Sequence, residues 1–287
     1  MKIGLLIPTW NAGPRFVRLL EQINRQTCLP ERKLVIDSSS TDGTAEAAQQ
    51  AGCSVIVIPK EEFRHGETRQ RAFEQMKDEV DCFLCLTQDV LIHDDSCFER
   101  LLSAFQDETV GAAYGRQLPH EGASISAALQ RRFNYPTVSQ IKYLSDRKTL
   151  GIKAPFLSNS FAAYRGKALD EIGGFPVDVD ICEDIYAGAK LLLKGYGIAY
   201  MADAQVYHSH DFTVTALFKR YAAMGRFYRK ERWLLESFGA TEKEGSRLLK
   251  YQIREALESG GLLTATELLW DDLLKYTAYC YGRSVFS

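Results

Sequence analysis

Asp89, His208 and His210 have the side-chain types and the spacing that could hold a metal ion. Asp89 follows the apolar run 82–86, and the two histidines follow the strand-like segment 204–207. A carboxylate at the crevice of a sheet can bind Mg2+ or Mn2+ together with substrate phosphates. Residues two apart on an extended chain share a face, so both imidazoles could approach one ion. The alternative interpretation of Asp89 is a simple turn aspartate.

Glu183 and Asp184 are adjacent acids at the start of a predicted amphipathic helix that ends at Gly195. At this position Asp184 could act as a general base and deprotonate an attacking hydroxyl. Acids in a first helical turn are also favoured by the helix dipole, whatever the function. The residues alone leave both interpretations open.

Asp37 ends the apolar run 33–36 and precedes a stretch rich in serine and threonine. A carboxylate there could accept the N3–H of a uracil or thymine ring. Asp and Ser also favour turns for local reasons, so a turn-capping role stays open. The sequence has neither a G-x-G-x-x-G nor a G-x-x-x-x-G-K-[ST] motif. A nucleotide would therefore bind without either common glycine-rich phosphate loop.

The elements that must position these side chains can be predicted from the periodicity of the first 90 residues. Short apolar runs at 3–7, 33–36, 54–58 and 82–86 are typical of strands. A helical stripe at 16, 19, 20 and 23 follows Pro14, and Asp42 could cap a helix over 45–50. This alternation predicts an α/β fold with a mostly parallel central sheet flanked by helices.

Ligands of such sheets bind beyond the carboxyl ends of the strands. The polar segments 8–11, 37–40 and 87–89 lie at those predicted ends. Further along, the runs 111–114, 161–164 and 198–201 predict short strands between helices. From Thr213 onward the pattern is helical and amphipathic to the end.

Composition narrows the classes of function. The chain has 287 residues, 46% hydrophobic and 25% charged, with a net charge of −2. This is a globular composition that offers no general field for nucleic acid. No stretch of 18 uncharged apolar residues predicts a membrane span, and the N-terminal apolar run is too short for a secretory signal. We therefore expect a cytoplasmic protein.

The seven cysteines are an odd number scattered through apolar segments, as expected for reduced thiols. Cys82 and Cys85 form a C-x-x-C, but residues three apart on a strand point to opposite faces. A redox or zinc role is not expected for this pair.

Nine short strings occur in an order and spacing that resemble the inverting family 2 glycosyltransferases of the GT-A fold, and within them the bacterial rhamnosyltransferases. They span about residues 1–230 and are Ile7-Pro-Thr-Trp-Asn11, Val35-Ile-Asp-Ser-Ser-Ser-Thr-Asp-Gly-Thr44, Phe63-Arg-His-Gly-Glu-Thr-Arg69, Leu86-Thr-Gln-Asp89, Tyr114-Gly-Arg-Gln-Leu-Pro119, Phe156-Leu-Ser-Asn159, Gly173-Gly-Phe175, Glu183-Asp184 and Val206-Tyr-His-Ser-His210. The resemblance implies a GT-A catalytic domain over 1–212, with a nucleotide-sugar half (about 1–110) and an acceptor half (about 111–212). A helical C-terminal extension would then cover 213–287.

The resemblance also implies roles for individual residues. The nucleotide-sugar donor would be contacted by Pro8, Thr9, Asn11, Asp37, Ser39, His65, Gly66, Arg69 and Gln88. Within this set, Asp37 would read the pyrimidine, the turn at Gly66 would let backbone approach the donor, and Arg69 would face the diphosphate. Asp89 would be the last acid of the DXD metal motif, with His208 or His210 as a further ligand. Asp184, beside Glu183, would be the catalytic base.

Three positions depart from the family pattern. Thr87 replaces the first acid of the DXD motif, which leaves one carboxylate for the metal. Ser38 replaces the second acid that usually follows Asp37. Gln70 stands where many relatives have Asn.

By this resemblance the reaction is a single inverting displacement that needs a divalent cation, Mg2+ or Mn2+. The expected donor is dTDP-L-rhamnose, with a UDP-sugar as the alternative, and the acceptor is a hydroxyl of a glycan or a lipid-linked glycan. A nucleotidylyltransferase is a rival that would need a glycine-rich loop after the first strand, where only Gly13 is found. A non-catalytic sugar-nucleotide-binding subunit is the other rival. The sequence does not predict an oligomeric state.

The stretch 217–233 carries six basic side chains interleaved with five aromatic ones. Such a segment can lie at a membrane interface, so a peripheral contact with the inner membrane is one interpretation. The alternatives are that the aromatic side chains pack on the catalytic domain, that the bases meet the donor diphosphate, or that the charges form a solvated face.

Overall fold

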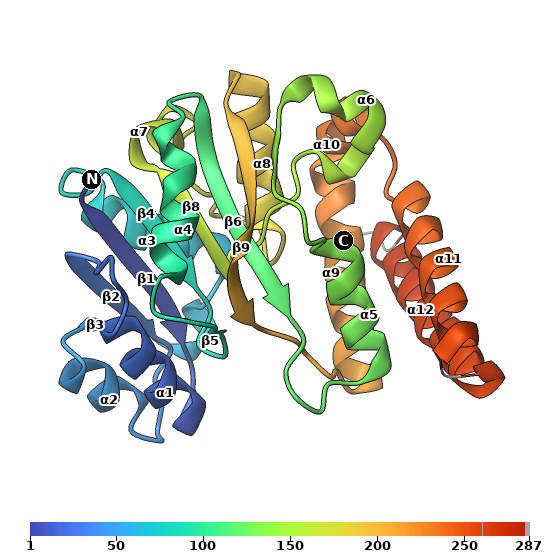
Figure 1. Ribbon diagram of the computed structural model, residues 1–287, viewed down its shortest axis with the longest axis horizontal. Helices are drawn as coiled ribbons and strands as arrows, with labels where there is room; N and C mark the ends of the chain where they lie inside the picture. The colour runs from blue at the N-terminus through green and yellow to red at the C-terminus, as the bar shows by residue number, and fades with distance from the viewer. Residues whose placement is uncertain (260, 285–287) are drawn as a thin grey trace.

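A single mixed sheet organises the protein, as a computed structural model that describes residues 1–259 and 261–284 shows (Figure 1). The strand order is β3-β2-β1-β4-β8-β6-β9-β5, and β7 pairs with β9. The strands are β1 (Ile3–Thr9), β2 (Arg32–Asp37), β3 (Ser54–Val57), β4 (Cys82–Leu86), β5 (Leu91–Ile92), β6 (Val110–Leu118), β7 (Gln140–Lys142), β8 (Phe161–Arg165) and β9 (Gly197–Tyr207). The predicted α/β class is confirmed.

The helices flank this sheet and continue beyond it at the C-terminal end (Figure 1). They are α1 (Gly13–Asn24), α2 (Thr44–Gln50), α3 (His65–Met76), α4 (Cys97–Leu102), α5 (Ile125–Asn134), α6 (Arg147–Leu150), α7 (Gly166–Glu171), α8 (Glu183–Lys194), α9 (Val214–Lys230), α10 (Arg232–Phe238), α11 (Glu242–Ser259) and α12 (Gly261–Ser284).

The longer strands run in one direction except β8. Strands β3, β2, β1 and β4 are parallel, and β6 is parallel to β9, whereas β8 is antiparallel to both β4 and β6. The register places Thr9 of β1 beside Asp37 of β2. The carboxyl ends of β1, β2 and β4 therefore meet at one edge, where the polar segments were expected.

Local sequence explains the first two helices. Pro14 stands in the first turn of α1, where its missing N–H costs nothing, and the stripe at 16, 19, 20 and 23 is buried. The predicted cap of α2 is shifted by one residue, because Gly43 with φ +85° occupies the N-cap position. The Asp42 carboxylate instead accepts hydrogen bonds from the backbone N–H and hydroxyl of Thr44 (3.1 and 2.6 Å).

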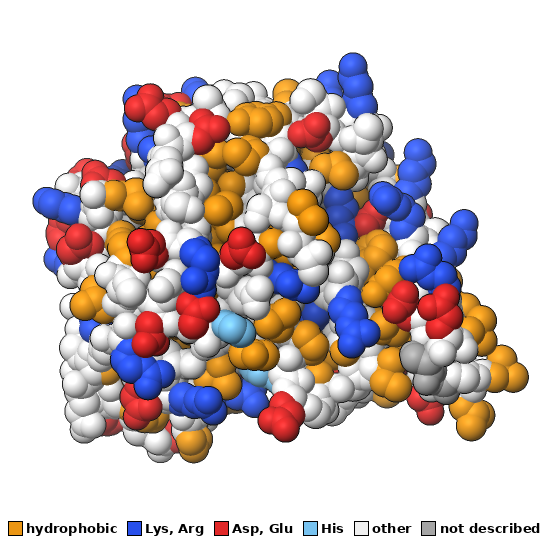
Figure 2. All heavy atoms as spheres, viewed as in Figure 1, with side chains coloured by type: hydrophobic (Ala, Val, Ile, Leu, Met, Phe, Trp, Pro, Cys, Tyr) orange, Lys and Arg blue, Asp and Glu red, His pale blue; other side chains and the backbone are white. Residues whose placement is uncertain are grey.

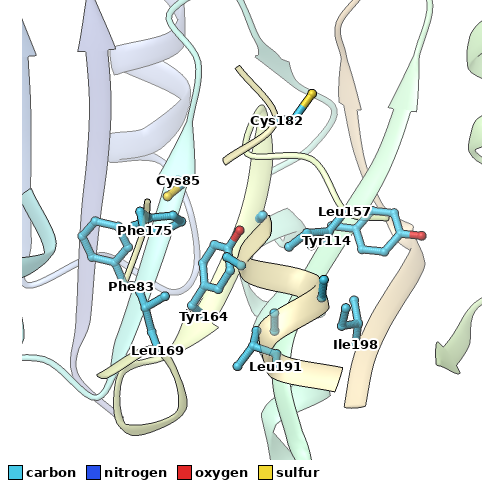
Figure 3. Close-up of a cluster of buried hydrophobic side chains, with 14 of the residues drawn as sticks. Phe83, Cys85, Tyr114, Leu157, Tyr164, Leu169, Phe175, Cys182, Leu191 and Ile198 are labelled. Carbon is cyan, nitrogen blue, oxygen red and sulfur yellow. The ribbon is translucent and has the colours of Figure 1, made fainter. Parts of the chain in front are cut away.

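Two hydrophobic clusters stabilise the sheet. Figure 3 shows part of one, in which Phe83, Tyr164 and Phe175 pack with ring centroids 5.1–6.1 Å apart. Cys85 belongs to this cluster and Cys82 to the other, as expected for opposite faces of a strand. Burial raises the pKa of Cys85 to about 12, so its thiol stays protonated at neutral pH.

The C-terminal helices extend the first of these clusters. Phe227 and Tyr228 of α9, Phe238 of α10 and Tyr279 of α12 are buried in it, and Trp233 packs edge-on against Tyr186 at 5.5 Å. The aromatic side chains of 217–233 thus largely face the protein interior. Among the interpretations of this stretch, packing of its aromatic side chains on the catalytic part is the one that the structure realises.

None of the described helices combines the length and the apolar character that crossing a membrane requires.

Candidate active site

Asp89, His208 and His210 converge beyond the carboxyl ends of β4 and β9. The nearer Asp89 oxygen lies 3.5 Å from His208 Nε2 and 3.5 Å from His210 Nδ1. One ligand atom from each of the three residues lies within 4.8 Å of the others. Asp89 is far from the two histidines in the sequence, and the sheet brings them together because β4 and β9 end at the same edge.

The donor set at this place fits a divalent cation. His208 Nδ1 lies 2.9 Å from Gln117 Oε1 and must donate to it, which leaves Nε2 with a free lone pair. This Nε2 atom is buried and has no hydrogen-bond partner within the described part of the chain. A buried, unsatisfied acceptor is costly, and a metal ion would satisfy it. One carboxylate and two imidazoles suit Mn2+ better than Mg2+, which prefers oxygen ligands.

The charges of the three residues favour the ionisation states that bind metal. Burial alone would raise the pKa of Asp89, but its contacts with His208 and His210 bring that pKa well below its usual range. Burial lowers the pKa of His208 and, with His208 as a neighbour, that of His210 to about 4. At neutral pH the group is therefore a carboxylate with two neutral imidazoles.

Asp184 stands in the first turn of α8, where Cys182 at the N-cap position has φ +68°. A left-handed conformation in a non-glycine residue is strained, and such strain is concentrated at functional sites. One Asp184 oxygen accepts from the Ile185 N–H (2.8 Å) and the other from the Asn159 N–H (3.3 Å). Burial, and then the charge of Glu183, raise the pKa of Asp184 to about 7. A carboxylate with this pKa is suited to take a proton near neutral pH.

Glu183 is buried and ion-paired. Its Oε1 lies 3.1 Å from the guanidinium of Arg69 and accepts from Asn159 Nδ2 at 2.9 Å. The hydroxyl of Tyr164 in turn donates to Asn159 Oδ1 (2.7 Å). Burial opposes ionisation of Glu183, but Arg69 outweighs it and lowers the pKa. Glu183 therefore stays charged beside Asp184 and helps to fix its position.

Arg69 is buried beside Glu183, and its predicted contact with the donor diphosphate stays a prediction. Its side chain is 2% exposed, and besides Glu183 it contacts the carbonyl of His65 at 3.0 Å. These contacts use Nη1 of the guanidinium, whereas Nε is buried without a hydrogen-bond partner within the described part of the chain. We assign Arg69 to holding Glu183, and His65, half-buried 3.3 Å from the Arg69 guanidinium, to the same cluster.

Gly66 lies in the first turn of α3, and a Cβ added there would stand 1.8 Å from the Pro176 carbonyl oxygen. The residue permits α3 to contact the loop before α8, and so brings Arg69 to Glu183. Its predicted contact with the donor stays a prediction.

Ser158 and Asn159 connect the two halves of the site. Gln117, which orients His208, donates from Nε2 to Ser158 Oγ (3.0 Å). The next residue, Asn159, contacts both Asp184 and Glu183. A short hydrogen-bonded path therefore joins the candidate metal ligands to the candidate base.

At the ends of β1 and β2, the predicted nucleotide-binding residues form a tight turn. The Asp37 carboxylate is 1% exposed and accepts from Thr9 Oγ1 (2.8 Å), Ser40 Oγ (2.6 Å) and the Ser40 N–H (2.8 Å). The turn-capping interpretation is thus realised, while one oxygen accepts a single bond and keeps a free lone pair. The neighbouring Ser38 hydroxyl is buried without a partner within the described part of the chain. A pyrimidine contact by Asp37 stays a prediction.

The other predicted donor residues frame this turn. Asn11 has φ +43°, accepts from the Thr41 N–H (2.9 Å) and so joins the β1 loop to the β2 loop. Gln88 joins the β4 loop to β1 through two bonds with the backbone of Trp10 (2.7 and 3.1 Å). Ser39 has φ +56° and donates to the Ile58 carbonyl, and Pro8 is buried in β1.

A pocket of about 300 Å3 opens over Asp89 and His210. The acids Glu121 and Asp211 also line it, and two of its basic lining residues were not predicted. They are Arg15, at the start of α1, and His120, whose ring nitrogen lies 3.3 Å from the Arg15 guanidinium. Arg220 of α9 lies over the Phe212 ring at 5.5 Å, beside His210. The basic residue after Pro14, at a predicted helix start, was the available signal for Arg15, since helix N-termini attract phosphate.

Comparisons with known proteins agree with this geometry. The family described as "Glycosyl transferase family 2" matches residues 5–173. The chain is 39% identical over 97% of its length to the O-antigen chain rhamnosyltransferase WbaN of Salmonella anatum, covering 88% of that protein. It is 38% identical over 99% of its length to the O-antigen chain rhamnosyltransferase RfbN of Salmonella typhimurium, covering 90% of that protein.

Solved structures share the fold at low sequence identity. The mannosyltransferase PcManGT of Pyrobaculum calidifontis, in complex with GDP-Man and Mn2+, superposes with a TM-score of 0.59 at 17% identity over 98% of this chain and 84% of that one. Residues 1–349 of S. aureus TarS, in complex with UDP-GlcNAc, give 0.59 at 16% identity over 99% of this chain and 90% of that one. With the family match and the two full-length relatives, the chain belongs to glycosyl transferase family 2, and it is an inverting glycosyltransferase of the GT-A fold.

Proposed function

We propose that the protein transfers L-rhamnose from dTDP-L-rhamnose to a hydroxyl of a glycan or lipid-linked glycan on the cytoplasmic side of the membrane. The observation that carries this proposal is the similarity over nearly the whole chain to two O-antigen chain rhamnosyltransferases. A UDP-sugar donor is the alternative, because the Asp37 carboxylate accepts an N3–H that thymine and uracil share.

The acceptor half of the reaction is assigned to Asp184. As the acceptor oxygen attacks the anomeric carbon, its proton passes to Asp184, and the bond from that carbon to the diphosphate breaks. A pKa of about 7 lets the carboxylate be free at neutral pH and still bind the proton. Glu183, held by Arg69 and Asn159, keeps the base in place during this step.

The donor half is assigned to the residues at the pocket over Asp89. Asp89, His208 and His210 would hold a divalent cation, and a bound cation supplies positive charge against the departing diphosphate. Arg15 lines the same pocket, and Arg220 lies beside His210. Both place positive charge where the leaving group gains negative charge, which is the usual form of stabilisation in phosphate release.

The donor is tested with purified protein and a panel of dTDP-L-rhamnose, UDP-glucose, UDP-GlcNAc and GDP-mannose. The measurements are the shift in melting temperature and the rate of nucleotide diphosphate release. We expect both to be largest for dTDP-L-rhamnose. Selective release of UDP from a UDP-sugar would show that this sugar, and not rhamnose, is the one transferred. Binding of a donor without release, even with a glycan acceptor present, would support the non-catalytic alternative.

The metal site is tested with Asp89→Asn. We expect transfer to fall by about a hundredfold, because a charged ligand near the diphosphate contributes several kcal/mol to the transition state. Titration of the wild-type protein with Mn2+ should show one binding event that the variant lacks. The matched control is Asp95→Asn, an exposed acid in the loop after β5, which should leave both readouts unchanged. Activity that resists chelators and survives Asp89→Asn would show a metal-independent site.

A further inference from the structure

Helix α12 exposes a largely apolar face, of which Tyr281 also packs on Phe218 of α9 with ring centroids 5.7 Å apart. Its large apolar side chains on this face are between 46% and 81% exposed and are Leu262, Leu263, Leu269, Trp270, Leu273, Tyr276 and Tyr281. Their spacings of three, four and seven place them on one side of the helix. The charged residues of α12, namely Glu267, Asp271, Asp272, Lys275 and Arg283, all fall outside this arc.

The opposite side of α12 is already occupied by the rest of the protein. Ala265, Leu268 and Ala278 are buried. A Cβ on Gly282 would stand 2.0 Å from the Ala222 carbonyl of α9, which shows how closely the two helices pack. The exposed face is therefore not the side by which α12 packs on the rest of the protein. Contiguous apolar surface of this kind on a folded protein indicates an interaction site.

A basic row runs along α11, the helix that packs against α12. Lys243, Arg247, Lys250 and Arg254 follow one another at intervals of four, three and four, so they share one side of the helix. Arg247 and Arg254 each pair with a glutamate at 3.3 Å, whereas Lys243 and Lys250 form no ion pair within the described part of the chain.

Two residues of α6 prolong the row. Arg147 and Lys148 face Lys243 and Arg247 across a pocket of about 520 Å3 between α6 and the start of α11. Figure 2 shows blue side chains over α6 and α11 on the right of the molecule, with red side chains between them and the orange ones at the lower right. The two helices α11 and α12 are fixed side by side, in part by the ion pair of Arg283 with Glu242 (2.8 Å).

We propose that α11 and α12 dock the protein on an anionic lipid surface. The apolar face of α12 enters the interface, and the basic row pairs with headgroup phosphates. The position of the row, and not the net charge, favours an anionic surface, because α11 and α12 together hold six Lys and Arg and seven Asp and Glu, whereas the row and the two α6 residues gather six basic side chains. Trp270, Tyr276 and Tyr281 are side chains that favour the membrane interface.

Charge distinguishes this occupant from a second copy of the chain. A partner copy seated on the α12 face would bring its own basic row into the same region, and like charges there oppose association. An anionic lipid surface satisfies the row and the apolar face together. This inference rests on the proposed function, which places the reaction at the membrane. Docking itself needs no catalytic activity.

The apolar part is tested by flotation of the full-length protein with vesicles of phosphatidylcholine containing about a third phosphatidylglycerol. Leu273→Glu should lower the bound fraction at least about tenfold, because a charge replaces an apolar side chain at the centre of the face. The matched control is Leu29→Glu, at the far end of the sheet, since both leucines are 54% exposed. Equal binding by both variants would overturn the proposal.

The electrostatic part is tested with the double variant Lys243→Gln/Lys250→Gln. We expect the double variant to bind anionic vesicles about tenfold more weakly than the wild type. Binding of the wild type should itself fall at high salt and on vesicles of pure phosphatidylcholine. Lys167→Gln/Lys194→Gln, two exposed lysines of the catalytic part, should bind as wild type. Salt-independent binding to neutral vesicles would overturn the role of the basic row.

Insertion is read directly from Trp270. Its fluorescence should shift to the blue on addition of anionic vesicles, and Trp270→Phe should remove the shift while the variant still floats. Donor release measured on the same samples separates this inference from the proposed function, because Leu273→Glu should release nucleotide as the wild type does. A dimer in solution that Leu273→Glu dissociates, with no flotation of the wild type, would assign the face to a second copy instead.

Discussion

Asp184 gains its basicity from burial and from the charge of Glu183, so the pH dependence of the rate should report on this one residue. The rate should rise with pH as Asp184 loses its proton, with a midpoint near its pKa of about 7. Asp184→Asn should lower kcat by about a thousandfold and leave donor affinity nearly unchanged, because the proton is shared only as the acceptor attacks. The measurement is a pH profile of kcat with a donor-binding titration. Equal loss of donor affinity would move Asp184 to the donor site.

The same raised pKa predicts an effect on stability. The folded state holds the Asp184 proton more tightly than the unfolded state does, so stability falls as pH rises from about 4 through about 7. Above pH 7, Asp184→Asn should therefore raise the melting temperature. The expected gain in unfolding free energy is only about 1–2 kcal/mol, because solvent screens a half-buried side chain. The gain should vanish near pH 4. A lower melting temperature at neutral pH would show that Asp184 serves the helix dipole.

Glu183→Gln separates positioning from proton transfer. Removing the charge next to Asp184 should lower the pKa of that base, so the rise in rate moves to lower pH. It also leaves Arg69 as a buried, unpaired charge, which should destabilise the protein by about 3–5 kcal/mol. The control for lost charge in the same region is Asp180→Asn, because the exposed ion pair of Asp180 with Arg64 contributes little to stability. An unshifted pH profile with a normal melting temperature would contradict both roles.

Sequence reasoning found the acids and histidines of the site because they stand directly after apolar runs or at a helix start. It did not show the pairing of Arg69 with Glu183, since no local pattern indicates that α3 contacts α8 more than a hundred residues later. The pairing with Glu183 is a tertiary contact. His120 was missed for the same reason, because its relation to Arg15 depends on β6 ending at the edge where α1 begins.

At the scale of elements, the first turn of α3 fixes the position of the site. Gly66→Ala should cost several kcal/mol in unfolding free energy, because the new Cβ meets the Pro176 carbonyl at 1.8 Å and the backbone must move. Gly245→Ala in α11 is the matched control, since nothing lies within 4 Å of a Cβ there. It should stabilise the protein by up to about 1 kcal/mol. Chemical denaturation of both variants measures the difference, and equal effects would show that α3 can shift freely.

Element existence was more predictable than element ends. The apolar runs at 3–7 and 82–86 became β1 and β4, because a fully buried strand needs apolar residues at every position. β9 was expected over 198–201 and 204–207 as separate pieces, yet it continues through Asp203, which is exposed. Exposed polar residues interrupt the apolar pattern of a strand, so the sequence does not show its full length.

At the scale of the whole molecule, the C-terminal helices and the catalytic part share one core. Because Phe227, Phe238 and Tyr279 are buried with Phe83, we expect a single cooperative unfolding transition. Gly282→Leu should lower its midpoint by several degrees, since the new Cβ would stand 2.0 Å from the backbone of α9. Calorimetry measures both. Two separate transitions, with only one moved by the variant, would show that the extension folds by itself.

The adjacency of Ser158 and Asn159 sets the span between the leaving group and the incoming hydroxyl. One residue is tied to Gln117 and thereby to His208, and the next is tied to Asp184. The two points at which the halves of the site are anchored are thus one peptide unit apart, a distance that does not stretch. An acceptor sugar must fit that span with the attacked hydroxyl toward Asp184, so the choice among its hydroxyls is made partly by this dipeptide. Inserting a single glycine between Ser158 and Asn159 would lengthen the span and alter which hydroxyl is glycosylated before it altered donor binding.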